Sequence, residues 1–260
     1  MIAPKEAPYE IYALKYSGPL TGSGAFILWM REWEKTVERA YFFWCIKGEG
    51  GPIVVDCGVA PDLAHQKALP GYVSPAEALE RIGVDASTVR RVIVTHMHWD
   101  HISGIELFPE ATIYVQKNEF DFWVNDPIAK RPVFASVADT AAIDYLARLE
   151  GGDRLILIDG DEEILPGIEL LLAPGHTPGL QAVAVRTNSG TAIIGSDCGH
   201  FFRNYEEDWP STLIVDLPAW MKTYDKLKAK VTSDKLLFPG HDPLMLANYP
   251  PVAEGVARLA

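Results

Sequence analysis

The chain has 260 residues, 48% of them hydrophobic, so one domain of this length can bury a sizeable core, and we expect a single domain over residues 1–260. Its formal net charge is -12, and no Lys/Arg cluster is interleaved with aromatic residues, which argues against a nucleic-acid partner. Residues 1–8 lack the basic start and apolar core of a signal peptide, and no apolar run reaches the length of a membrane span, so we expect a cytoplasmic monomer or homodimer with no membrane partner.

The first 82 residues predict strands followed by helices. Alternating polar and apolar side chains are typical of strands, and Gly48–Gly51 separates two such runs as the turn of a hairpin does. Ser74 is a residue type that caps helix N-termini, and Pro75 suits the first helical position. Residues 30–39 are an amphipathic excursion between strands. The predicted strands are 9–16, 41–46 and 52–55, and the predicted helices are 61–68 and 75–82.

After residue 90, short apolar runs alternate with helical segments. Residues 92–95 are apolar and β-branched, as buried strands are. Ser103, with Glu106 three residues later, predicts the N-terminus of a short helix. Residues 135–149 place apolar side chains along one stripe of a longer helix. The other predicted strands are 112–115, 154–158, 162–165, 168–173, 181–187, 191–196 and 236–238, and the other predicted helices are 117–124, 218–231 and 252–259.

Four potential metal ligands lie within six residues, directly after the strand predicted at 92–95, in the order H-x-H-x-D-H. Alternate side chains of an extended segment share one face, so His96 and His98 can converge on one cation. Asp100 and His101 fall in the turn that follows and can point to a second cation. Imidazole and carboxylate ligands together suit zinc first, with iron and manganese as alternatives.

Three further polar residues also follow apolar runs and lie beside Gly or Pro: His176, Asp197 and His241. An isolated H-x-H pair is often no more than two hydrogen-bonded core histidines. Here the added Asp-His pair and the three remote segments make a metal cluster the simpler interpretation. Unrelated turn residues would need a separate explanation in each segment.

This set of residues resembles the metal motif of the metallo-β-lactamase superfamily, and Val54-Val55-Asp56-Cys57-Gly58 resembles the D-x-G element upstream of it. The resemblance implies an α/β fold with the αβ/βα four-layer arrangement, in which helices flank two packed mixed sheets. It also implies two divalent metal ions, with Asp56 supporting the metal loop rather than binding a metal. The implied ligands are His96, His98 and His176 for the first ion, Asp100, His101 and His241 for the second, and Asp197 as the bridge.

Within the superfamily, the chain most resembles the N-acyl homoserine lactone lactonases. The resemblance implies a metal-dependent hydrolase in which a metal-bridging hydroxide attacks a lactone carbonyl, while Asp100 also transfers a proton. Those lactonases commonly carry Tyr three residues after the bridging Asp, but here that position is His200. The expected substrate is therefore either an N-acyl homoserine lactone or a small catabolic lactone, including an acidic one. A thioester hydrolase of the glyoxalase II type is the alternative, because it shares the ligand set.

Substrate contacts are predicted on both sides of the motif. His200 can donate a hydrogen bond or, when charged, pair with a substrate carboxylate, and Arg203 can assist by bidentate contact. The alternative for Arg203 is a surface ion pair with a neighbouring glutamate. Three residues of the early loop are candidates for an apolar pocket wall or a dimer contact, or else for an ordinary surface connection: Trp29, Met30 and Trp33.

Overall fold

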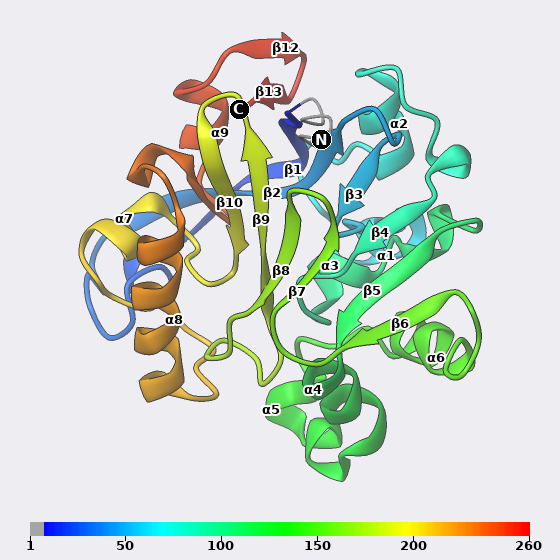
Figure 1. Ribbon diagram of the computed structural model, residues 1–260. Helices are drawn as coiled ribbons and strands as arrows, with labels where there is room; N and C mark the ends of the chain where they lie inside the picture. The colour runs from blue at the N-terminus through cyan, green and yellow to red at the C-terminus, as the bar shows by residue number, and fades with distance from the viewer. Residues whose placement is uncertain (1–7) are drawn as a thin grey trace.

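The computed structural model describes residues 8–260, so nearly all of the segment that carries the signal-peptide expectation, residues 1–7, lies outside the described residues. The chain forms two mixed sheets with helices on their outer sides (Figure 1). This is the predicted αβ/βα arrangement. Within residues 8–260, no helix is both long enough and apolar enough to cross a lipid bilayer.

The larger sheet has eight strands in the order β12-β13-β1-β2-β3-β4-β5-β6. Strands β1 to β3 pair antiparallel, whereas β3 to β6 run parallel, so the carboxyl ends of β3 and β4 meet at one edge. The strands are β1 (Glu10–Ser23), β2 (Thr36–Lys47), β3 (Ile53–Val55), β4 (Arg91–Ile93), β5 (Thr112–Gln116), β6 (Leu155–Ile158), β12 (Pro251–Ala253) and β13 (Val256–Arg258).

The smaller sheet has five strands in the order β11-β10-β9-β8-β7. Strand β9 pairs antiparallel with both β8 and β10, and β11 is parallel to β10, so β8, β10 and β11 end at the same edge. The strands are β7 (Glu162–Leu165), β8 (Ile168–Leu172), β9 (Gln181–Thr187), β10 (Gly190–Ser196) and β11 (Leu237–Pro239).

Three apolar clusters hold these layers together. The middle cluster contains inward-facing residues of both sheets, such as Phe42 and Trp44 of β2 with Val183 and Val185 of β9, so it is the core between them. A second cluster joins the larger sheet to its helices, and a third joins the smaller sheet to α8. Burial of this apolar surface is the main force that stabilises the sandwich.

The helices are short apart from α8. The sequence predicts α1, α2, α4 and α8, and it predicts α6 with an earlier start, but it does not predict α3, α5, α7 or α9. Ser74 precedes α2 as predicted, although its side chain makes no capping hydrogen bond. The helices are α1 (Pro61–Gln66), α2 (Pro75–Glu80), α3 (Trp99–Ile102), α4 (Lys117–Phe120), α5 (Pro132–Ala135), α6 (Thr140–Arg148), α7 (Phe202–Glu206), α8 (Leu217–Lys230) and α9 (Leu244–Ala247).

The prediction of a final helix at 252–259 is wrong. The segment forms the hairpin β12–β13, which turns at Gly255 with φ of 70° and pairs with β1. The apolar run there is too short to separate helix from strand by its own pattern, and pairing with the edge of the larger sheet decides its conformation.

Two helix starts and one connection also differ from the prediction. Ser103 ends α3 instead of beginning a helix, and its hydroxyl donates to the Trp99 carbonyl (2.6 Å). The helix expected from residue 135 begins only at Thr140, because the Asp139 carboxylate accepts from the Ala141 amide and caps it there. The excursion at 30–39 is a turn whose last residues, from Thr36, already belong to β2.

Candidate metal centre

All seven predicted ligands follow the carboxyl ends of strands at one edge of the sandwich. The loop after β4 carries His96 and leads into α3, for which His98 is the N-cap and in which the acidic and the third imidazole ligand lie. His176, Asp197 and His241 follow β8, β10 and β11 of the other sheet. Strand ends of open α/β sheets commonly carry ligand sites, because loops from separate segments meet there.

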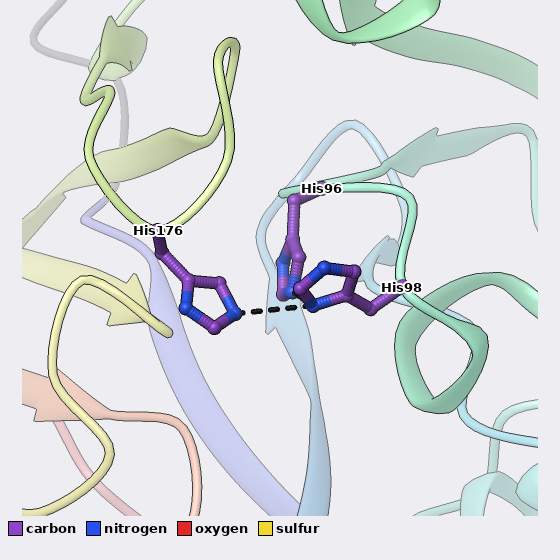
Figure 2. A group of neighbouring side chains, drawn as sticks. All are labelled: His96, His98 and His176. Atoms are coloured by element: carbon purple, nitrogen blue, oxygen red, sulfur yellow. Dashed lines mark hydrogen bonds between the residues drawn. The ribbon is translucent and has the colours of Figure 1, made fainter. Parts of the chain in front are cut away.

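Three imidazoles converge in the first part of the cluster, two from the loop after β4 and one from the loop after β8 (Figure 2). His98 Nδ1 lies 3.1 Å from His96 Nε2 and 3.1 Å from His176 Nε2. A tetrahedral zinc ion with Zn–N distances of about 2.0–2.1 Å separates its nitrogen ligands by roughly 3.3 Å. The spacing of these three buried nitrogens therefore suits a single ion.

The Asp197 carboxylate faces two groups of imidazoles at once. Its Oδ2 lies 3.4 Å from His176 Nε2 and 3.9 Å from His96 Nε2. Its Oδ1 lies 3.6 Å from His101 Nε2, and His241 Nε2 lies 3.2 Å from both carboxylate oxygens. The carboxylate thus lies between two neighbouring groups of imidazoles and can contact a cation in either.

The second group has both the ligand types and the unsatisfied atoms that a cation requires. Asp100 Oδ2 lies 3.7 Å from His101 Nε2 and 3.7 Å from His241 Nε2. His101 Nε2 and Asp197 Oδ1 are buried and accept no hydrogen bond from any residue between 8 and 260. Buried polar atoms normally have partners, so a cation at this position would complete their interactions.

Asp56, which follows β3, orients the metal loop through Thr95 and His101. Its Oδ1 accepts from the Thr95 amide (2.7 Å), and its Oδ2 accepts from the Thr95 hydroxyl (2.8 Å). The same Oδ2 lies 2.7 Å from His101 Nδ1. If Nδ1 donates to this carboxylate, Nε2 keeps the lone pair that faces the cluster, which is how metal-binding histidines are commonly oriented.

Burial sets the charge of most of these groups. It lowers the pKa of His96 and His98 well below the ordinary value and that of His176 to about 3, so these imidazoles are neutral and can bind a cation. Burial would also lower the pKa of His101, but the carboxylates around it raise that pKa to about 10. Burial would raise the pKa of Asp197, but the neighbouring imidazoles hold it well below its usual range, so this carboxylate is ionised.

His200 lies within the cluster rather than beside it. Its Nε2 is 3.1 Å from Asp197 Oδ2, and its ring stacks on Phe26 with the centroids 5.4 Å apart and the planes 24° apart. Burial lowers the pKa of His200 below the ordinary value. The position therefore combines an imidazole next to the predicted bridge with an aromatic support.

Arg203, a predicted substrate contact, is already bound by carboxylates. Its Nη1 and Nη2 donate to the two oxygens of Glu32 (3.1 and 3.0 Å), and its Nε donates to Glu207 (2.8 Å). The surface ion pair that was the alternative interpretation is thus what the structure contains. In this conformation the guanidinium is not free for a substrate carboxylate.

The predicted apolar contacts lie on an exposed loop. Trp29, Met30 and Trp33 are 38%, 60% and 63% exposed. The loop is tied to a second segment, because the Trp29 amide donates to the Pro210 carbonyl (2.9 Å) and Trp209 Nε1 donates to the Trp29 carbonyl (2.8 Å). Their grouped exposure is compatible with a pocket wall or a dimer contact, and both remain predictions.

A buried carboxylate that the sequence analysis missed joins the loops of the three converging imidazoles. Glu119 of α4 accepts at Oε1 from the Met97 amide (2.9 Å) and from Trp123 Nε1 (2.7 Å). Its Oε2 accepts from the Thr177 hydroxyl (2.6 Å) and the Gly179 amide (3.0 Å). Met97 lies between two of the imidazole ligands and Thr177 follows the third, so one side chain fixes both loops.

No local signal in the sequence distinguishes Glu119 from a surface glutamate. The donors on Met97 and Gly179 are 22 and 60 residues away along the chain. Burial raises the pKa of the Glu119 carboxyl, and the four donors lower it in part. A Cβ at Gly179 would lie 2.2 Å from the Glu119 backbone nitrogen, so this close approach requires glycine.

Comparison with models of known protein families matches residues 37–241 to the metallo-beta-lactamase superfamily. The chain belongs to this superfamily. The matched range contains every strand end of the cluster, from Asp56 to His241. The superfamily match, the His/Asp cluster and the similarity to lactonases together identify a metal-dependent hydrolase.

Relatives of known function include lactonases. The chain is 27% identical over 217 residues to the N-acyl homoserine lactonase AiiA of Bacillus thuringiensis subsp. kurstaki. This match covers 76% of this chain and 80% of AiiA. It is 25% identical over 223 residues to the N-acyl homoserine lactonase AttM of Rhizobium radiobacter, with coverage of 80% and 83%.

Solved structures show the same fold at lower identity. A quorum-quenching N-acyl homoserine lactone lactonase has a TM-score of 0.77 and 21% identity, with coverage of 94% of this chain and 96% of that one. AidC, described as a dizinc quorum-quenching lactonase, has a TM-score of 0.72 and 20% identity, with coverage of 92% and 89%. At these identities the likeness establishes the fold alone.

Replacing Glu119 by Gln should weaken metal retention without abolishing folding. The amide has one acceptor oxygen where the carboxylate has two, so a donor on one of the two loops loses its partner. Supporting groups of metal ligands commonly contribute about ten- to hundredfold in metal affinity. The measurement is zinc bound per chain after dialysis against graded chelator concentrations, together with the thermal midpoint of the zinc-free form.

The matched control is Glu110→Gln, which removes an exposed carboxylate that pairs only with Arg90. Because exposed pairs contribute little, this variant should retain zinc as the unmodified protein does. Equal zinc retention in the Glu119→Gln and Glu110→Gln variants would mean that Glu119 does not position the ligand loops.

Proposed function

We propose that this hydrolase opens lactone rings with two divalent ions, zinc in the first instance, held by the seven-residue cluster. The observation that carries the proposal is the position of the Asp197 carboxylate between two groups of imidazoles. His96, His98 and His176 would hold one ion and Asp100, His101 and His241 the other, with Asp197 shared. Lactonase relatives at 25–27% identity, together with the dizinc AidC as a fold neighbour, support this assignment.

Two divalent ions in this cluster would lower the pKa of a shared water from about 15.7 toward about 7 and polarise the lactone carbonyl. Asp100 is the more accessible of the two carboxylates, with 12% of its side chain exposed against 4% for Asp197. The Asp100 carboxylate would accept the water proton and deliver it to the ring oxygen when the bond between that oxygen and the carbonyl carbon breaks. The Tyr16 hydroxyl donates to the Asp100 carbonyl (2.6 Å) and fixes its backbone.

His200 would orient the lactone by a hydrogen bond from its imidazole. It stands three residues after Asp197, where the resembling lactonases commonly carry Tyr, and Phe26 supports its ring. AiiA and AttM are named for N-acyl homoserine lactones, which makes this class one candidate substrate. The change at His200 makes a small catabolic lactone, including an acidic one, the other candidate.

Replacing Asp197 by Asn should lower metal content and kcat together. The amide nitrogen cannot bind a cation, so one of the two positions loses an oxygen ligand. We expect about one tightly bound ion per chain where the unmodified protein binds two, measured by elemental analysis beside steady-state kinetics. Asp208→Asn, at an exposed residue paired with Lys228, is the control. Two ions per chain with full activity in the Asp197→Asn variant would refute the bridging role.

A substrate panel tests the reaction itself. Zinc-loaded protein should hydrolyse lactones faster than thioesters, should lose this activity on chelation and should regain it when zinc is restored. The panel contains N-acyl homoserine lactones of several chain lengths, simple γ-lactones, lactone acids and thioesters. The hydrolysis rate of each is measured from the acid that it releases at constant pH. Fast thioester cleavage with slow turnover of every lactone would show that the glyoxalase II-type alternative is correct.

A further inference from the structure

Arg39, in β2, is a guanidinium without an acidic partner beside the metal cluster. Among residues 8–260 no carboxylate forms an ion pair with it, and its Nε is buried without a hydrogen-bond partner. Arg203 is the opposite case, since two carboxylates bind it. Other described arginines also form no ion pair, but Arg39 is the only arginine among residues 8–260 whose buried Nε has no hydrogen-bond partner.

The Arg39 guanidinium lies over two rings that themselves contact the cluster. Its central carbon is 4.3 Å from the Phe26 ring centroid and 5.8 Å from the Tyr41 centroid. Phe26 stacks on His200, and the Tyr41 ring meets His241 edge-on at 5.2 Å. The guanidinium is therefore one aromatic ring away from two imidazoles of the cluster.

Strand β2 holds Arg39 in a fixed place relative to the predicted ligands. The Ala40 amide donates to the His241 carbonyl (3.0 Å), and His241 Nδ1 lies 3.1 Å from the Ala40 carbonyl oxygen. The residue next to Arg39 is thus tied on both backbone groups to a predicted metal ligand. A cation on such a rigid support is well suited to fix the orientation of a bound substrate.

A second cationic side chain, Lys67, lies near the same group of aromatic rings. The Lys67 ammonium lies 4.2 Å from the Trp99 ring centroid, and Trp99 meets Tyr41 edge-on at 5.6 Å. Lys67, like Arg39, forms no ion pair with any acidic residue in the described range 8–260. Two cations without ion pairs among the described residues thus border the aromatic rings beside the cluster, although the chain as a whole is strongly acidic.

A partly buried guanidinium whose Nε has no acceptor loses hydration that its ring contacts restore only in part. Cations bound in the neighbouring cluster would add to the positive potential that Arg39 experiences. Nη1 and Nη2 form no hydrogen bond within residues 8–260, so an anion from outside the chain can bind there, offset the lost hydration and balance the positive potential. The planar fork of arginine matches a carboxylate in two hydrogen bonds, which makes a carboxylate the chemical group that fits best.

We propose that Arg39 determines substrate specificity by binding a carboxylate that the lactone carries about one ring width from its carbonyl. This inference rests on the proposed lactonase function. It selects compact acidic lactones over lactones with a neutral acylamide tail. The residue that binds the carboxylate is then Arg39, which precedes the His96–His101 motif in the sequence, and not Arg203, which follows it.

The kinetic test compares γ-butyrolactone bearing a carboxylate on its γ carbon with the neutral carboxamide of the same lactone. Zinc-loaded unmodified protein should have a higher kcat/KM for the acid, mainly through a lower KM. Arg39→Met should lower the acid-to-amide ratio of kcat/KM by at least about tenfold, the effect expected for one lost charge-assisted contact. Arg39→Lys, which keeps the charge but not the fork, should give an intermediate ratio.

The matched control is Arg148→Met, which removes another guanidinium that lies over an aromatic ring, Tyr145. It changes the net charge equally, and among the described residues the Tyr145 ring contacts none of the cluster imidazoles. The Arg148→Met ratio should equal that of the unmodified protein. An Arg39→Met variant that loses acid and amide turnover by the same factor would overturn the proposal and assign Arg39 a structural role.

A binding measurement separates this inference from the lactonase proposal. Tetrahydrofuran-2-carboxylate has no bond to hydrolyse, so its Kd can be measured by calorimetry with zinc-loaded protein whether or not any lactone is a substrate. The Kd should be at least about tenfold weaker in Arg39→Met than in unmodified protein of equal zinc content. Equal Kd values would refute carboxylate binding by Arg39, whereas weaker binding without turnover of any lactone would refute only the lactonase proposal.

Discussion

The metal centre depends on buried polar atoms that face one another without protein partners. His101 Nε2 and Asp197 Oδ1 have no hydrogen bond within residues 8–260, although both are buried. An unpaired group of this kind costs about 1–3 kcal/mol, which a bound cation recovers. The surrounding structure keeps this arrangement from relaxing, because Asp56 orients one imidazole and Glu119 joins the loops of three others.

The chemistry of the site could be predicted from the sequence because its central motif is local. Four predicted ligands lie within His96–His101, and the other three follow apolar runs that are recognisable as strands. Positioning and specificity residues gave no such signal. Arg203 and Arg39 look equivalent in the sequence, and only the packing shows that two carboxylates bind the first while aromatic faces alone surround the second.

The same contrast holds for the fold. The strands β1 to β11 have apolar runs long enough to be found by pattern, whereas their arrangement in two packed sheets was implied by the family resemblance. The errors occur where a neighbour decides the conformation. The segment after Pro250 became a hairpin because the edge of β1 accepts it, and α6 begins late because Asp139 supplies the capping carboxylate. Local propensity has little influence on the hairpin, whereas the start of α6 follows a local capping signal that the apolar stripe by itself does not reveal.

The division of the ligands between the two sheets has a consequence for stability. His96, His98, Asp100 and His101 extend from the larger sheet, whereas His176, Asp197 and His241 extend from the smaller one. Ions held by both groups would act as a cross-link between the two halves of the sandwich. Separation of the sheets at this edge would then require dissociation of the ions, so resistance to unfolding should rise with the free metal concentration by mass action.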